Sequence, residues 1–188
     1  MPKIVDHDVR RLEILEQSFD LFADRGYAAV SMRQLATALG VSTGTLYHYF
    51  PNKSALFEAM LRSLAVSDVE TALASLDSGM GLQGRLAVIQ AYLSAEADHI
   101  KQVLWVTIDY QRTVGVAAHG LIKEVLDVYH AAIAEHLCDG DWSQASIHIS
   151  YIIGVLVHRG LVPGGFDLGL HLNSLAPLSN EQEKSICA

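Results

Sequence analysis

The sequence has few of the residues that mark several common classes of protein. Its 188 residues include two cysteines and four prolines, and 18% of them are charged. Cys138 and Cys187 show no metal-ligand spacing, so we expect a reducing, cytoplasmic setting and neither a disulfide-rich nor a zinc-stabilised domain. The scarcity of proline, together with the lack of alternating Val, Ile and Thr runs, argues against hairpin-rich folds and favours helices.

Positive charge is also scarce. Thirteen Lys and Arg residues stand against twenty-one Asp and Glu residues, which gives a net charge of −8. Residues 1–62 hold seven basic and seven acidic residues, so the acidic excess lies in the remainder. Proteins that bind nucleic acid usually carry a basic surface. Any phosphate contact here must therefore depend heavily on hydroxyl groups, backbone amides and helix dipoles.

Long hydrophobic runs are missing too. The longest clean apolar run, residues 151–157, is too short to cross a bilayer. Residues 1–12 are polar and contain Asp6 and Asp8, which is unlike a signal peptide. We therefore expect a cytoplasmic protein without a membrane partner.

What the sequence does contain is a series of apolar residues at three- and four-residue spacing, the mark of amphipathic helices. This spacing predicts an all-α fold. The predicted helices cover residues 9–24, 31–39, 43–50, 53–76, 86–100, 103–112, 121–137 and 142–159, with a last short one inside 166–178. A glycine-containing break at 77–81 places a domain boundary after residue 76.

Residues 31–53 form the most informative stretch. Ser31 is followed three residues later by Gln34, which fits a capping box at the start of a helix. Gly40 ends that helix, and Ser42 or Thr43 caps the next one after a tight turn. Two short helices joined in this way are typical of a helix-turn-helix motif.

The second helix of this pair has two unlike sides. Leu46 and Phe50 make its apolar side. Its other side presents hydroxyl, imidazole and phenol groups that suit a DNA groove: Thr43, Gly44, Thr45, Tyr47 and His48. Asn52 caps a further helix, and Lys53 at its start adds a charge for phosphate. The alternative interpretation is an ordinary aromatic patch at the end of a helical bundle.

Residues 40–53, Gly-Val-Ser-Thr-Gly-Thr-Leu-Tyr-His-Tyr-Phe-Pro-Asn-Lys, resemble the DNA-binding domain of the TetR/AcrR family of bacterial transcriptional regulators. Upstream, Phe19, Phe22, Gly26, Tyr27 and Ser31 extend the resemblance, which covers about residues 8–60. It implies a three-helix DNA-binding head and a larger helical regulatory domain. It also implies a homodimer that binds a palindromic operator, most often as a repressor released by a small-molecule effector.

From these observations we expect a helix-turn-helix domain at 1–52, a connecting helix at 53–76 and an effector-binding and dimerisation domain at 77–188. The resemblance implies that the family's usual DNA contacts fall on ten residues: Ser31, Arg33, Ser42, Thr43, Gly44, Thr45, Tyr47, His48, Tyr49 and Lys53.

An effector pocket needs mostly apolar walls and a few placed polar groups. Within residues 86–126, seven polar or aromatic residues stand among apolar ones: Tyr92, His99, Trp105, Asp109, Tyr110, Arg112 and His119. We predict that the effector binds among them, although Asp109 and Arg112 also fit a simple surface pair.

The helices at 121–137 and 142–159 are the predicted homodimer interface. The second of them is apolar almost all round and must be covered on more than one side. Two such helices from each subunit would form a four-helix bundle. The alternative is that both are core helices of a single subunit.

Catalytic chemistry has little support. The nine histidines include no pair spaced three or four apart, and they form no zinc-type cluster with the cysteines. There is neither a phosphate-binding glycine loop nor a nucleophile elbow, so we expect no enzyme activity, cofactor or metal. Two alternatives remain: a helical cavity protein with metal-dependent or other activity, and a regulator controlled by a protein partner. Cys187 is either a redox sensor or an idle thiol.

Overall fold

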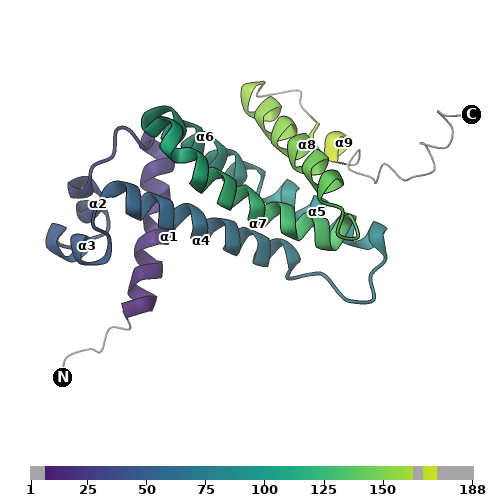
Figure 1. Ribbon diagram of the computed structural model, residues 1–188, viewed down its shortest axis with the longest axis horizontal. Helices are drawn as coiled ribbons and strands as arrows, with labels where there is room; N and C mark the ends of the chain where they lie inside the picture. Colours follow the sequence, from purple (N-terminus) through teal and green to yellow (C-terminus); the bar gives the residue numbers. More distant parts are fainter. Residues whose placement is uncertain (1–6, 163–166, 173–188) are drawn as a thin grey trace, which may run out of the picture. The chain divides into compact units, whose positions relative to one another are not determined.

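The computed structural model describes residues 7–162 and 167–172, and these residues form helices without any strand (Figure 1). The expected all-α class is confirmed. The helices are α1 (His7–Arg25), α2 (Met32–Ala38), α3 (Thr43–Tyr49), α4 (Lys53–Leu73), α5 (Leu82–Ala95), α6 (Ala97–Val114), the 3-10 helix η1 (Gly115–Ala118), α7 (His119–Leu137), α8 (Trp142–Leu161) and α9 (Leu168–Leu172). None of the described helices is long and apolar enough to cross a membrane.

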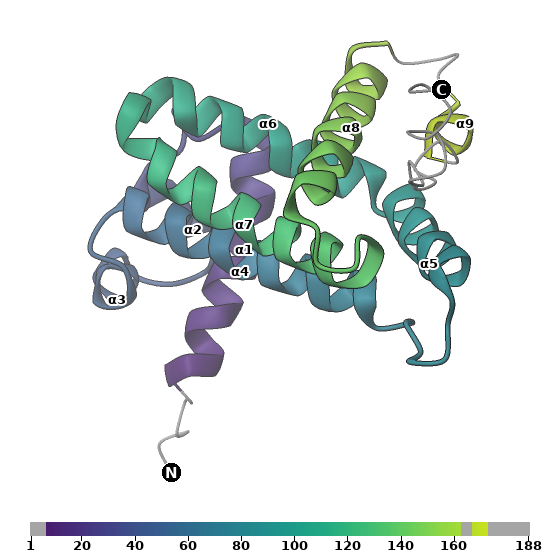
Figure 2. The ribbon, with the colours of Figure 1, turned by 45° about the vertical axis from the view of Figure 1, so that its right-hand side comes forward.

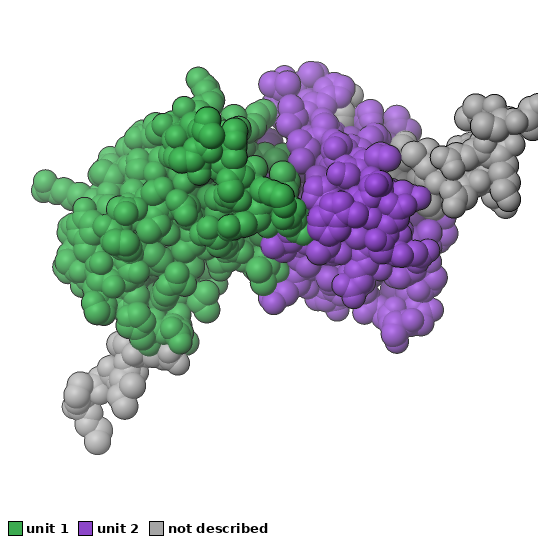
Figure 3. Space-filling view, in the orientation of Figure 1, with its two compact units in different colours: residues 1–68, 102–127 green, residues 69–101, 128–188 purple. Residues whose placement is uncertain are grey.

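The chain divides into two compact units (Figure 3). Residues 1–68 and 102–127 make the first unit, and residues 69–101 and 128–188 make the second. The divisions fall inside α4, α6 and α7, so each of these helices contributes residues to both units. The predicted domain boundaries after residues 52 and 76 stay predictions.

In the first unit, α1 packs against α2 and α2 packs against α3 (Figure 2). The apolar spacing in α1 buries Ile14, Phe19 and Phe22, while α2 and α3 each bury one leucine completely, Leu35 and Leu46. Burial of such a side chain contributes about 1.5–3 kcal/mol. One anchor per short helix is enough to fix which side of α3 faces outward.

The helix ends in this region follow the predicted capping. The Ser31 hydroxyl accepts a hydrogen bond from the backbone N–H of Gln34 at 3.3 Å, and the Gln34 side chain accepts one from the Ser31 N–H at 2.8 Å. Gly40 has the positive φ, 65°, that closes α2. Ser42, and not Thr43, caps α3, since its hydroxyl accepts the Thr45 N–H at 2.9 Å.

Two predicted helix ends are wrong. The break that we predicted between residues 100 and 103 lies instead at Glu96. The Glu96 N–H donates to the Tyr92 carbonyl, and the Glu96 carbonyl accepts from the Ile100 N–H. Residues 85–114 contain neither glycine nor proline, so nothing in the local sequence marked that stop. The helix predicted to reach residue 76 ends at Leu73. A short helix was predicted within 166–178, and α9 is the part of it that lies in the described residues. Cys187 lies outside the described residues.

The second unit contains α5, α8 and α9, together with the end of α4, the start of α6 and the second half of α7. Its core joins residues far apart in sequence: Leu86, Ala134, Leu137, Cys138 and Ala145. Two side chains fasten α9, since the Gln90 amide donates to the Leu172 carbonyl at 2.7 Å and the Tyr151 hydroxyl donates to the His171 carbonyl at 2.8 Å. The core of this unit therefore depends on contacts that no local pattern encodes.

Candidate nucleic-acid interface

The exposed side of α3 gathers most of the residues predicted to contact DNA. Burial of Leu46 and of Phe50, which follows the helix, turns the other side chains of α3 outward. Eight of the ten predicted residues are exposed, in the loop before α2, in α2 and in α3: Ser31, Arg33, Ser42, Thr43, Gly44, Thr45, Tyr47 and His48. Tyr49 and Lys53 are half-buried. The arrangement is a short polar helix face of the size that fits a major groove.

Some of these hydroxyl groups already have structural partners. Ser31 and Ser42 use their side-chain oxygens as helix caps. The hydroxyls of Ser42 and Thr45 also lie 2.8 Å apart, within hydrogen-bond distance. Thr43 and Tyr47 of α3 are therefore better placed to reach a base edge or a phosphate than Ser42, which caps the helix.

The side chain of Lys53 is held against the protein itself, by contacts with Tyr27. Its ammonium group donates a hydrogen bond to the Tyr27 carbonyl at 2.7 Å and lies 4.1 Å from the centre of the Tyr27 ring. Burial lowers the pKa of Lys53, and the carboxylate of Asp109 opposes that shift. A phosphate contact by Lys53 has to share or displace this attachment to the turn after α1.

Asp109, which the sequence assigned to the effector site, contacts that same turn. Its carboxylate accepts the backbone N–H of Ala28 at 3.1 Å. A Cβ added to Gly26 would lie 2.9 Å from the same carboxylate oxygen, and Gly26 has a φ of 77°. The turn therefore needs glycine for its backbone conformation, and a side chain at position 26 would in addition force the Asp109 carboxylate to shift.

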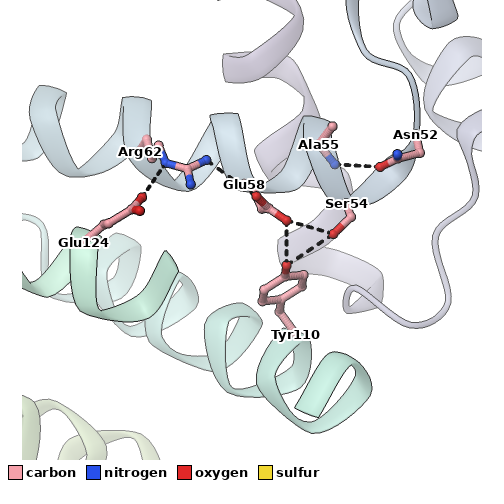
Figure 4. Close-up of polar contacts among 7 residues, drawn as sticks. All are labelled: Asn52, Ser54, Ala55, Glu58, Arg62, Tyr110 and Glu124. Atoms are coloured by element: carbon pink, nitrogen blue, oxygen red, sulfur yellow. Dashed lines mark hydrogen bonds and ion pairs between the residues drawn. The ribbon is translucent and has the colours of Figure 1, made fainter. Parts of the chain in front are cut away.

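Tyr110 is buried beside the head, with 1% of its surface exposed. Its ring centre lies 4.6 Å from that of Phe57 and 4.8 Å from that of Tyr27. Its hydroxyl donates to Glu58 at 3.0 Å and lies 3.2 Å from the Ser54 hydroxyl (Figure 4). Burial raises the pKa of Tyr110.

The polar network continues along α4. The Ser54 hydroxyl also donates to Glu58, at 3.0 Å, and Arg62 pairs with Glu58 at 3.6 Å (Figure 4). Arg62 then bonds Glu124 of α7 at 2.9 Å. The first half of α4, which follows α3, is thus tied to both α6 and α7. No sequence pattern marks Ser54, Glu58 or Glu124, because only their spatial neighbours reveal their role.

The seven predicted effector residues are divided between the two compact units. Trp105, Arg112 and His119 are exposed in the first unit, where Asp109 and Tyr110 contact the head. Tyr92 and His99 are half-buried and belong to the second unit. The assignment of an effector site to these residues stays a prediction.

Two residues of α1 that the sequence analysis did not single out also lie at this surface. The His7 ring lies beside Tyr49 and His48, and the Arg11 guanidinium lies 5.0 Å from the centre of the Phe50 ring. They stand one turn apart on α1, a spacing that gave no sign of which helix they meet.

Comparison with known proteins agrees with this geometry. Residues 14–60 match the model of a family described as bacterial regulatory proteins, tetR family. The HTH-type transcriptional repressor KstR2 of Rhodococcus jostii (strain RHA1) is 34% identical over 95 residues, which cover 48% of this chain and 45% of that protein. The chain thus spans less than half of the length of this curated relative.

Two further matches extend over most of the chain. The HTH-type transcriptional regulator BetI of Escherichia coli (strain SMS-3-5 / SECEC) is 24% identical over 170 residues, covering 78% of this chain and 87% of that one. The structure of FadR from Bacillus subtilis, solved with stearoyl-CoA, has a TM-score of 0.72 at 18% identity and covers 87% of this chain and 94% of that one. At this identity the last match shows the fold alone. Residues 14–60 thus match the tetR family of bacterial regulatory proteins, and most of the chain shares its all-helical fold with a solved structure.

Proposed function

We propose that this protein is a transcriptional regulator that binds duplex DNA as a homodimer and leaves it when a small molecule binds. The observation that carries the proposal is the exposed polar face of α3, set on a buried leucine anchor and followed by a capped helix start. Thr43 and Thr45 are the side chains proposed to read base edges, and Tyr47 is proposed to contact the backbone. Repression is the favoured outcome, because the KstR2 relative is named a repressor.

The head carries little positive charge, and this supports a dimer. Arg33 and Lys53 are the two basic residues within 31–53, and Lys53 is bonded to Tyr27. Affinity for phosphate grows with the number of phosphates neutralised. A single head should bind weakly, whereas two heads spaced about one DNA turn, roughly 35 Å, would bind a palindrome together.

An uncovered stripe on α8 is the proposed dimer surface. Ile147 and Leu161 are 54% and 68% exposed, and Ser150, Gly154 and His158 lie between them at helical spacing. A Cβ on Gly154 would meet no described atom within 4 Å, so there is room for the close approach of another helix. The exposed positions of α7 include Lys123, Glu124 and Glu135. We therefore assign the larger share of the interface to α8, with α7 at its side.

The contacts of α6 offer a route from effector to DNA. Asp109 and Tyr110 are adjacent on α6, and they bond the turn after α1 and the start of α4. An effector that binds better when α6 is displaced would loosen both contacts and shift the population away from the DNA-bound form. The effector is unassigned; the FadR structure holds stearoyl-CoA, which is a property of that protein. A non-enzymatic, cytoplasmic regulator follows from the same proposal.

Selection of DNA by the purified full-length protein tests the proposal. A pool of random duplexes is enriched for binders, and the enriched duplex is compared with a scrambled duplex of equal length at several salt concentrations. We expect an inverted repeat with half-sites about one turn apart and a preference of at least about 1,000-fold over the scrambled duplex. Equal affinity for both duplexes would overturn the proposal.

A further inference from the structure

The first turn of α1 lies against the end of the recognition helix. The ring centre of His7 is 4.5 Å from that of Tyr49, with a tilt of 31°, and 5.5 Å from that of His48, at 81°. His48 and Tyr49 also meet edge to face at 5.5 Å. Three rings from two helices thus form one cluster, which we call the His7 cluster, and its members are His7, His48 and Tyr49.

The cluster lies at the C-terminal end of α3, where no further helical turn stabilises the helix. Tyr49 is the last residue of α3, and Phe50 after it has an extended backbone with φ −139° and ψ 117°. The end of a helix frays unless other contacts hold it. The Phe50 ring faces the Arg11 guanidinium of α1. Residues of α1 therefore hold both the last side chain of α3 and the first one after it.

The polar ends of the cluster remain accessible. His7 and His48 are exposed, and Tyr49 is half-buried. Among the described residues, no hydrogen bond is found for the Tyr49 hydroxyl. A ring that is packed on one side and free at its hydroxyl is suited to donate to a phosphate oxygen at low entropic cost.

We propose that His7 is a positioning residue for DNA binding: its imidazole fixes the Tyr49 ring so that the Tyr49 hydroxyl contacts the DNA backbone. The inference rests on the proposed function and deepens it, because it extends the DNA-binding surface from α3 to the start of α1. His7 acts through Tyr49, so its effect requires the Tyr49 hydroxyl. It reads no base, so it changes affinity for all sequences alike.

The charges around His7 agree with this role. On α1, Arg10 is paired with Glu13 at 2.6 Å, while Arg11 is directed to Phe50. Asp8 is the acidic neighbour in sequence. His7 thus adds a hydrogen-bonding group, and Arg11 beside the cluster adds a charge, to a head that is poor in cations.

A double-mutant cycle separates positioning from simple packing. The probe is the duplex enriched by the full-length protein from a random pool, with a scrambled duplex beside it. We expect His7→Ala to weaken binding to both duplexes about three- to ten-fold, the range expected for one aromatic pair. His7→Phe retains a ring and should restore binding to within about two-fold of the wild type.

Tyr49→Phe removes the hydroxyl and keeps the ring. In that background we expect His7→Ala to cost less than about two-fold more, because the group that His7 positions is already gone. Gln17→Ala, an exposed change on the same helix, is the matched control and should leave binding unchanged.

The outcomes are distinct. If the wild-type protein prefers no duplex, the proposed function fails and the role of His7 fails with it. If the wild type binds specifically but His7→Ala has no effect, the inference alone is overturned. If His7→Ala costs the same factor with and without the Tyr49 hydroxyl, His7 only packs, and the inference is overturned as well.

Discussion

The exposed sides of α3 and α8 differ in their chemistry. On α3 the exposed side chains are hydroxyls, an imidazole and a phenol, with Tyr47 50% exposed. On α8 the exposed stripe contains Ile147 and Leu161, with Ser150, Gly154 and His158 between them. A polar face loses little when it is left in water, whereas an apolar stripe gains by being covered. The exposure of α3 and α8 thus indicates that each can contact a partner. The chemistry of the exposed side chains indicates whether that partner is polar or apolar.

The largest expected effect is on the α8 stripe. Ile147→Glu places a charge in the proposed apolar interface, so we expect a monomer and a loss of operator affinity of at least about 100-fold. Sedimentation gives the oligomeric state and a binding titration gives the affinity. The matched control is Val116→Glu, at a position that is 79% exposed and outside α8; it should remain dimeric. A dimeric Ile147→Glu protein would remove the distinction between the two faces.

A second change tests what holds the α3 head in place. Gly26→Ala should lower the free energy of unfolding by about 2–3 kcal/mol, because it combines a left-handed backbone with a contact of 2.9 Å to Asp109. Gly40→Ala is the matched control: its φ is also positive, at 65°, but nothing lies within 4 Å of the added Cβ. Denaturant titration should show a smaller loss, about 1 kcal/mol, for Gly40→Ala. Equal losses would mean that Asp109 does not crowd the turn.

The buried Tyr110 hydroxyl predicts a dependence on alkaline pH. Tyr110→Phe should cost about 1–2 kcal/mol at neutral pH, since the bond to Glu58 is lost. Burial raises the pKa of Tyr110 above its usual 10.0. Its contribution to stability is therefore complete below pH 10 and declines as the pH rises through the folded-state value. The variant should lose less stability than the wild type when denaturant titrations are repeated up to about pH 11. An unchanged alkaline slope would contradict this account.

The smallest expected effect concerns Lys53. Lys53→Gln should lower the free energy of unfolding by about 1 kcal/mol, because the bond to the Tyr27 carbonyl and the contact with its ring are lost. Binding to the enriched and the scrambled duplex should weaken equally, since an ammonium group reads no base. A changed sequence preference would contradict a backbone role, and unchanged stability would contradict the attachment to Tyr27.

Thr43→Ser should instead alter which duplex is preferred, because Thr43 is proposed to contact base edges.

The parts of the structure that the sequence predicted are those encoded within a few residues. The capping box of Ser31 and Gln34, the Leu46 anchor and the cap at Asn52 each depend on neighbours three or four positions away. The parts that it missed depend on distant residues. Asp109 and Ala28 are 81 positions apart, and Tyr110 and Glu58 are 52 apart.

The same reason explains the misplaced helix break and why the predicted effector residues are divided between two units. Apolar periodicity shows that a segment is helical, but it does not show what covers each side or where an uncapped helix stops, as at Glu96. Trp105 and Asp109 share a helix, yet one is exposed and the other is bonded to the head. Polar residues on a periodic helix therefore suggest a pocket in sequence without showing where they point.

The fit of Asp109 against Gly26 also bears on protein engineering. A chimeric regulator could be designed by exchanging the head, if the head were a detachable part. In this protein the Asp109 carboxylate accepts a hydrogen bond from the Ala28 N–H. A head with any side chain at position 26 would bring its Cβ too close to that carboxylate. A chimera joined at residue 52 must therefore keep glycine at position 26, or take residue 109 from the same protein as the transplanted turn.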